Sequence, residues 1–131
     1  MKSQSRTNML IVDNDEKIPM TFQQLLENDG FNIVSTWSGH EALSLLRSGR
    51  FDVLLVDDYL PDLHAHDFLE RVGTLPIQPW VVVMQASTPT STELQQYQRL
   101  GAATVVDKRD SEMVCQVLYQ YCVKQALTRI N

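Results

Sequence analysis

The sequence predicts an α/β domain in which a parallel β-sheet is covered on both faces by helices. Short, almost continuous apolar runs recur along the chain, as is typical of strands that are buried on both faces. Segments with apolar residues at helical spacing alternate with these runs, and right-handed crossovers then place helices on both sides of the sheet. Acidic and polar residues follow directly where the runs end. Because ligands bind beyond the carboxyl ends of the strands in such sheets, we expect the functional site there.

Five apolar runs are predicted to form the strands. The third is the most distinctive, because residues 53–56 (Val-Leu-Leu-Val) stop abruptly at two adjacent carboxylates, Asp57 and Asp58. The second run is less uniformly apolar than the others, which suits a strand at the edge of the sheet. The predicted strands are residues 9–12, 31–34, 53–56, 80–84 and 103–106.

Five helices are predicted to alternate with these strands. Asp15 or Asn14 is expected to cap the first helix, which has Pro19 in its first turn, and Ser38 is expected to cap the second. The fourth helix has a thin apolar stripe, so we expect it to pack shallowly and to be able to move. The residues expected to face the core are, helix by helix, Ile18, Phe22, Leu25 and Leu26; Ala42, Leu45 and Leu46; Phe68, Leu69 and Val72; Leu94, Tyr97 and Leu100; and Val114, Val117, Leu118 and Tyr121.

Length, composition and charge limit the classes of function. At 131 residues the chain is predicted to be one domain, with a core at about residues 8–125 and short tails at both ends. The net charge of −5 and the pI near 5.0 argue against a domain that binds the nucleic-acid backbone or anionic lipid. No apolar run approaches the roughly 20 residues of a membrane span, and the first residues lack the apolar core of a signal peptide, so we expect a cytoplasmic protein. Cys115 and Cys122 are about 10.5 Å apart along one predicted helix, too far for an internal disulfide.

The predicted strand ends bring together acidic residues and one lysine. Asp13 and Asn14 follow the first strand, Asp57 ends the third, Gln85 follows the fourth and Lys108 follows the fifth. Such oxygen ligands suit Mg²⁺, a hard cation that is usually held together with waters and a phosphoryl oxygen. A carboxylate beside bound Mg²⁺ can attack a phosphoryl donor and become an aspartyl phosphate, while a lysine stabilises the phosphoryl oxygens as a point charge.

Three motifs, in order along the chain, resemble those of response-regulator receiver domains. They are Ile11-Val12-Asp13-Asn14-Asp15, Leu55-Val56-Asp57-Asp58-Tyr59-Leu60-Pro61 and Gly101-Ala102-Ala103-Thr104-Val105-Val106-Asp107-Lys108, which together span almost the whole chain. The resemblance implies a doubly wound, flavodoxin-like (βα)5 fold, a three-layer sandwich with a five-stranded parallel sheet of order 2-1-3-4-5. It also implies that Asp57 is the phosphoacceptor and that Lys108 contacts the phosphoryl group. The ligands that it implies for Mg²⁺ are Asp13, Asn14, Asp57 and the backbone carbonyl of Tyr59.

The chain departs from the family pattern at several switch positions. Asn14 stands where the family has a second acid. Gln85 stands where a Ser or Thr hydroxyl bonds the phosphoryl group and draws the following loop inward, and its amide is the candidate donor here. Val105 replaces the switch aromatic of the fifth strand, Arg109 replaces the proline after the lysine, and the usual loop glycine is replaced within residues 64–66 (His-Ala-His). The usual relay to the surface of the fourth helix and fifth strand is therefore in question.

These residues leave two functions open. In the first, a histidine kinase or a histidine phosphotransfer protein delivers a phosphoryl group to Asp57 with Mg²⁺. The altered surface then recruits or releases an effector domain, a downstream protein or a second copy of the chain through the fourth and fifth helices. In the second, the chain is an atypical receiver that acts as a protein-interaction module without phosphorylation. The substitutions at Asn14, Gln85 and Val105 favour this second function.

An enzyme of another class is not expected. The chain is expected to catalyse at most its own phosphorylation and dephosphorylation on Asp57. A phosphatase with an aspartate nucleophile would need a second Asp where Tyr59 stands, and a flavin protein would need a Ser/Thr/Gly-rich loop after the first strand.

Overall fold

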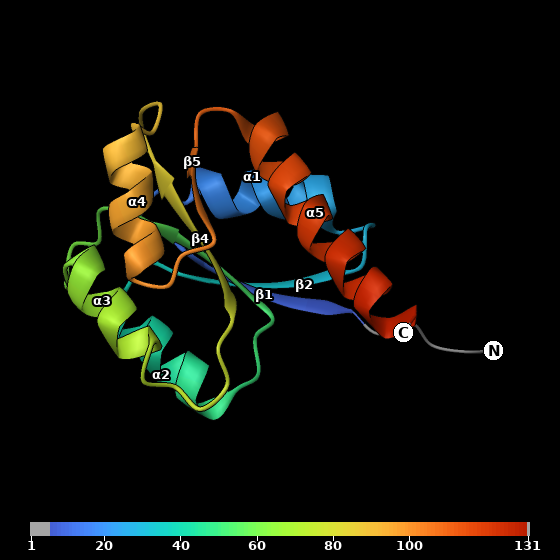
Figure 1. The fold of residues 1–131 in the computed structure, drawn as a ribbon, viewed down its shortest axis with the longest axis horizontal. Helices are drawn as coiled ribbons and strands as arrows, with labels where there is room; N and C mark the ends of the chain where they lie inside the picture. Colours follow the sequence, from blue (N-terminus) through green and yellow to red (C-terminus); the bar gives the residue numbers. More distant parts are fainter. Residues whose placement is uncertain (1–5, 131) are drawn as a thin grey trace.

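The computed structural model describes residues 6–130, with side chains for residues 6–125, as five parallel strands and five helices (Figure 1). The strand order is β2-β1-β3-β4-β5, which confirms the predicted fold class. The strands are β1 (Thr7–Val12), β2 (Phe31–Thr36), β3 (Val53–Asp57), β4 (Trp80–Gln85) and β5 (Thr104–Asp107). The helices are α1 (Lys17–Leu26), α2 (Gly39–Ser48), α3 (Ala65–Val72), α4 (Ser91–Arg99) and α5 (Ser111–Ile130).

The predicted tails are short segments before about residue 8 and after about residue 125. Residues 1–5 of the predicted N-terminal tail lie outside the described residues. At the other end α5 runs on to Ile130, past the core boundary predicted near residue 125. The single domain with a core at about residues 8–125 stays a prediction.

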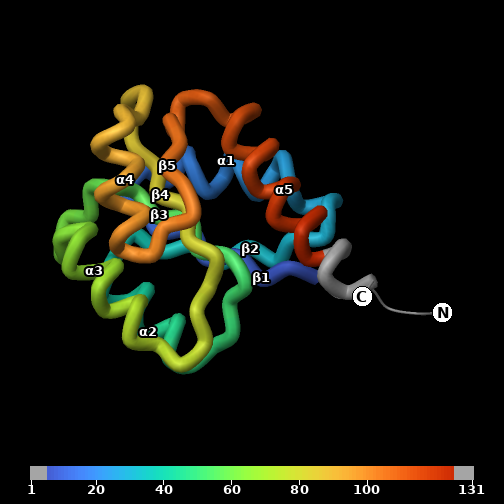
Figure 2. The backbone as a smooth tube through the Cα atoms, in the orientation of Figure 1, coloured from blue at the N-terminus to red at the C-terminus, as the bar shows by residue number. Residues whose placement is uncertain are grey.

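The helices form two layers around the sheet. Helices α1 and α5 cover one face, and α2, α3 and α4 cover the other, as the ribbon of Figure 1 and the tube of Figure 2 show. The strand pleat divides the core accordingly: in β1, Met9 and Ile11 pack towards α1 and α5, while Leu10 and Val12 pack towards the other three helices. Every residue of β3 is buried, as expected for a central strand covered on both faces.

The edge position predicted for the second strand is confirmed. Among the described strands β2 pairs with β1 alone, and it exposes Asn32, Val34 and Ser35 to solvent. The shallow packing predicted for the fourth helix is also confirmed, because no residue of α4 is fully buried. Its apolar residues Leu94 and Tyr97, and its C-cap residue Leu100, pack against the core but are only partly buried. Helix α4 is thus held by few buried contacts.

Two expectations for α1 are wrong. Leu25 is 48% exposed, because Phe22 and Leu26 define the buried stripe and Leu25 lies at its margin. The N-cap residue is Glu16, which makes no capping bond with its side chain; the Asp15 carboxylate accepts instead from the Lys17 amide at 3.0 Å. Pro19 lies in the first turn of α1, as predicted.

The loop after β3 is tied to the start of α2 by Asp62. Its carboxylate accepts from the Ser38 hydroxyl at 2.7 Å and from the backbone amides of Gly39 and His40 at 2.9 and 3.1 Å. Ser38 is the N-cap residue of α2, as predicted, and its own oxygen accepts from the Glu41 amide at 3.1 Å. The loop that follows Asp57 is therefore anchored on a neighbouring helix.

We expect Asp62→Ala to lower the free energy of unfolding by about 1 kcal/mol at pH 7, the usual cost of losing a capping side chain. Slight burial acts to raise the pKa of Asp62, but the hydrogen bonds from Ser38, Gly39 and His40 outweigh it and lower the pKa to about 2. A carboxyl with a lowered folded pKa stabilises above its unfolded pKa of 3.8 and loses this effect as the pH falls towards 2. Urea unfolding should therefore show a difference that shrinks over this range. Asp62→Asn, which keeps an acceptor oxygen, is the matched control; equal stability of Asp62→Ala and wild type at pH 7 would contradict the assignment.

Candidate phosphoryl-transfer site

Acidic side chains and a lysine meet at the carboxyl edge of the sheet. Asp57 is the last residue of β3, and Asp13 follows the neighbouring β1, where Val12 is in register with Val56. Lys108 follows β5, two strands away from β3. Because all five strands are parallel, their carboxyl ends lie at one edge.

The lysine bridges the two carboxylates. Lys108 Nζ lies 3.0 Å from Asp57 Oδ2 and 3.3 Å from Asp13 Oδ2. Both aspartates are 3% exposed, and the lysine side chain is 16% exposed. The three residues that the sequence placed at different strand ends are thus joined through Lys108.

The second oxygen of each carboxylate is held by the backbone. Asp13 Oδ1 accepts from the Asp15 amide at 2.8 Å, and Asp57 Oδ1 accepts from the Tyr59 amide at 3.4 Å. Each carboxylate therefore has one oxygen oriented by its own loop and one directed at Lys108, which fixes the orientation of both groups.

The electrostatics of this group favour a further cation. Burial raises the pKa of both Asp13 and Asp57, and it outweighs the opposing effect of Lys108. Burial alone would lower the pKa of Lys108, but its hydrogen bonds and attraction to Asp57 and Asp13 raise it. Two carboxylates and one ammonium leave a net charge of −1 in a mostly buried cluster, so a small cation beside the carboxylates would lower the cost of ionising them.

A family model for the response regulator receiver domain matches residues 9–118 of this chain. The chain belongs to the response-regulator receiver family. The family match confirms the resemblance seen in the sequence. Receiver domains are signalling modules of two-component systems and are generally not enzymes.

Curated relatives of this receiver domain are longer proteins. The cell cycle transcriptional regulator CtrA of Caulobacter vibrioides is 25% identical over 89 residues, which cover 68% of this chain and 38% of CtrA. The response regulator SaeR of Staphylococcus aureus is 33% identical over 82 residues, which cover 63% of this chain and 36% of SaeR. The match thus spans well under half of either relative.

Solved receiver structures share the fold. The chemotaxis response regulator CheY4 of Vibrio cholerae has a TM-score of 0.80 at 21% identity, covering 88% of this chain and 98% of that one. The receiver domain of HemR from Leptospira biflexa has a TM-score of 0.73 at 24% identity, covering 87% and 93%. At these identities the likeness establishes the architecture of the receiver domain.

The remaining predicted site residues are placed differently. Asn14 is exposed, next to the buried Asp13, and the side chain of Tyr59 points into solvent. Gln85 is 2% exposed, but its amide nitrogen bonds Ser87 and Glu93, and among the described residues it makes no hydrogen bond with Asp13 or Asp57. Val105 is buried in the core of the receiver domain, so no aromatic ring is available at that position to move between buried and exposed positions.

Glu93 is the site residue that the sequence reasoning missed. Its local role was readable, because Thr90-Ser91-Thr92-Glu93 matches a capping box, and the structure forms that box at the start of α4. Its contact with Gln85 joins residues eight positions apart across a loop. No sequence pattern specifies such a contact.

The donor set is compatible with magnesium but is small. Among the residues whose side chains are described, no three His, Cys, Asp or Glu side chains gather where they could hold a metal. Mg²⁺ does not require such a cluster, because it is commonly bound through one or two carboxylates with waters and phosphate oxygens as the other ligands. Asp13 and Asp57 meet that minimum.

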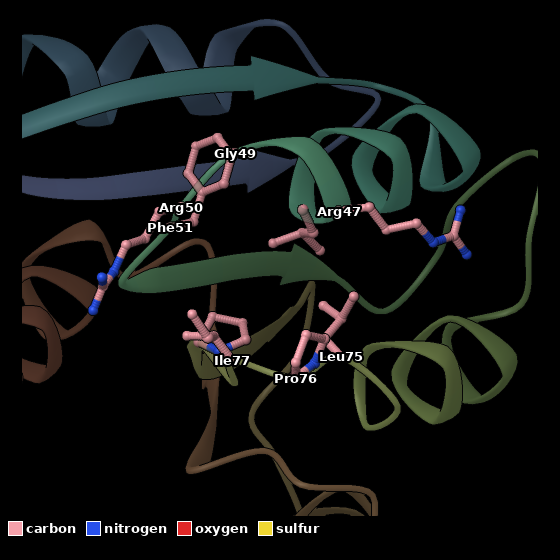
Figure 3. Close-up of a pocket in the computed structure, with 9 residues that line it drawn as sticks. Arg47, Gly49, Arg50, Phe51, Leu75, Pro76 and Ile77 are labelled. Carbon is pink, nitrogen blue, oxygen red and sulfur yellow. The ribbon is translucent and has the colours of Figure 1, made fainter.

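A separate cavity of about 170 Å³ lies at the opposite edge of the sheet (Figure 3). Its walls come from the end of α2, the loop before β3 and the loop before β4, and Phe51, Pro76 and Ile77 supply much of its apolar lining. In Figure 3 the side chains of Arg47 and Arg50 extend away from each other. This cavity shares no residue with the acidic cluster.

Among the described helices, none combines the length and apolar character needed to cross a membrane.

Proposed function

We propose that this receiver domain accepts a phosphoryl group on Asp57. The observation that carries the proposal is the contact of Lys108 with two buried carboxylates at the carboxyl edge of the sheet. A receiver domain with a buried, oriented carboxylate and an adjacent fixed ammonium has both the nucleophile and the charge that phosphoryl transfer needs.

The chemistry would proceed by direct displacement. An oxygen of the Asp57 carboxylate attacks phosphorus and forms the P–O bond of an acyl phosphate. The bond from phosphorus to the donor nitrogen or oxygen breaks, and its electron pair leaves with the donor, which takes up a proton. Lys108, 3.0 Å from the Asp57 carboxylate, neutralises charge on the phosphoryl oxygens, and Asp13 keeps the lysine oriented.

Magnesium is the cofactor that we propose for this step. Asp13, Asn14, Asp57 and the Tyr59 carbonyl would hold it. When bound, Mg²⁺ would neutralise the two carboxylates and the incoming phosphoryl oxygens. The raised pKa of both buried aspartates supports a requirement for a cation. Because Asn14 is neutral, we expect Mg²⁺ to bind more weakly than it would with a third carboxylate at position 14.

The partners follow from the same proposal. We infer a histidine kinase or a histidine phosphotransfer protein as donor in the cytoplasm, and an effector domain or downstream protein as recipient of the signal. A homodimer through α4 and α5 is a further inference of this kind, supported by the thinly packed α4 and by the exposed Met113 and Val123 of α5. The acidic surface supports a domain that binds proteins and does not itself bind nucleic acid or membranes.

The second candidate is a receiver that binds partners without phosphorylation. The engagement of Gln85 with Glu93, together with the exposed Asn14 and the buried Val105, favours it.

Incubation with Mg²⁺ and acetyl phosphate separates the two candidates. We expect the intact mass of the protein to rise by one phosphoryl group, and we expect Asp57→Asn and omission of Mg²⁺ each to prevent the rise. Asp58→Asn, which removes the neighbouring, half-buried carboxylate, is the matched control and should still be phosphorylated. If neither acetyl phosphate nor a phosphorylated histidine kinase adds mass to wild type, the phosphoacceptor proposal is wrong.

A further inference from the structure

The Gln85 side chain has no free donor in this structure. A primary amide nitrogen carries two N–H groups. Gln85 Nε2 lies 3.2 Å from Glu93 Oε1, 3.1 Å from Ser87 Oγ and 3.3 Å from the Ser87 carbonyl oxygen. Two N–H groups therefore already serve three acceptors, and a fourth acceptor can be bonded only if one of these contacts is given up.

Glu93 is the charged member of this set and is fixed in position. Its Oε1 also accepts from the Thr90 amide at 2.9 Å, while its own amide donates to Thr90 Oγ1 at 3.1 Å. These two bonds form the capping box that begins α4. The hydrogen bonds from Thr90 and Gln85 lower the pKa of Glu93, so its carboxylate is ionised at neutral pH and is a strong acceptor.

Gln85 stands between Glu93 and the proposed phosphoryl site. Its backbone carbonyl accepts from the Lys108 amide at 2.8 Å, and β4 lies between β3, which ends at Asp57, and β5, which precedes Lys108. The residue is thus fixed at the edge of the acidic cluster by its backbone, while its side chain is directed at the start of α4.

We propose that Glu93 is a positioning residue for Gln85: it holds the Gln85 amide against the start of α4 and competes with a group on Asp57 for that amide. This inference rests on the proposed role of Asp57 as phosphoacceptor. The competition couples the two ends of the loop, because a phosphoryl oxygen that takes the Gln85 amide also removes one of the two bonds to Glu93 Oε1. Helix α4 has no fully buried residue, so a change at its first turn meets little resistance from packing.

The resting contact is tested first, without any phosphoryl group. NMR of the Gln85 side-chain NH₂ signals in wild type, Glu93→Gln and Glu93→Ala reports whether Glu93 holds the amide. Glu93→Gln keeps the capping box and a neutral acceptor oxygen, so we expect a partial change of these signals. Glu93→Ala removes the acceptor, and we expect a full change. If the Gln85 signals are the same in all three proteins, the inference is wrong, whatever the result with phosphoryl donors.

The competition is tested with beryllium trifluoride and Mg²⁺ as a stable mimic of the phosphoryl group. Glu93→Ala is expected to raise the affinity for the mimic by about fivefold in the wild-type background, because Gln85 no longer has to leave a carboxylate. In the Gln85→Ala background, Glu93→Ala should change the affinity for the mimic only through the loss of one negative charge. The effect of Glu93→Ala should therefore differ between the wild-type and Gln85→Ala backgrounds. Equal effects in both backgrounds would overturn the inference. Absence of binding to every variant would contradict the phosphoacceptor proposal, and the NMR comparison would then decide the inference.

Discussion

Replacing Lys108 with methionine should slow phosphorylation of Asp57 by acetyl phosphate on the order of 100-fold, the usual effect of removing one group that stabilises transition-state charge. The substitution keeps most of the side-chain volume but removes the ammonium that contacts both carboxylates. The initial rate of mass increase under saturating Mg²⁺ measures this effect. A rate within about twofold of wild type would show that the lysine does not serve the phosphoryl group.

The same substitution should destabilise the fold, because it leaves two buried carboxylates without their cation. Breaking a fully buried pair costs about 3–5 kcal/mol, and since the Lys108 side chain is partly exposed we expect a smaller loss, about 1–2 kcal/mol at pH 7. Arg109→Met is the matched control. Arg109 makes a shorter ion pair, 2.6 Å to Asp107, but its side chain is 63% exposed, so its loss should leave both stability and phosphorylation almost unchanged.

Magnesium should stabilise the protein, and its effect should grow with pH. Without the metal, Asp13 and Asp57 have folded pKa values above the unfolded value of 3.8, so the folded state holds their protons more tightly. Their contribution to stability is therefore complete below pH 3.8 and is lost as the pH rises through the raised pKa values. Bound Mg²⁺ requires the deprotonated carboxylates and reverses this loss.

Urea unfolding with and without Mg²⁺, from below pH 3.8 up to pH 8, measures the stabilisation by the metal. At a concentration 100 times the dissociation constant, a ligand that binds the folded state alone adds about 2.7 kcal/mol. Asp57→Asn should remove most of the metal effect, and in the absence of metal it should raise stability, because it relieves one of two buried negative charges. Equal stability of wild type with and without Mg²⁺ at pH 8 would contradict the proposed metal site.

The fold was predictable because its signal is distributed along the chain. Residues 53–56 are uniformly apolar, and residues 31–34 are less so, which was sufficient to distinguish a central strand from an edge strand. The errors fell at the margins of helices. Leu25 belongs to the helical pattern of α1 but lies beside its buried stripe, and periodicity alone does not fix the width of such a stripe.

The meeting of Asp13, Asp57 and Lys108 was predictable from topology, since parallel strands end at a common edge. The direction of the Gln85 side chain was not. A buried amide bonds whichever acceptors surround it, and here these are Ser87 and Glu93, contributed by the loop and helix that follow. Side-chain contacts of this kind depend on loop geometry, which composition and spacing do not specify.

The most direct test of the phosphoacceptor proposal is to locate the modified residue in wild-type protein treated with Mg²⁺ and acetyl phosphate. Borohydride reduces an acyl phosphate of aspartate to homoserine, which is stable during digestion and peptide mass spectrometry. We expect homoserine at position 57 and unmodified aspartate at positions 13 and 58. Homoserine at either of those positions, or at none, would contradict the proposal that Asp57 is the phosphoacceptor.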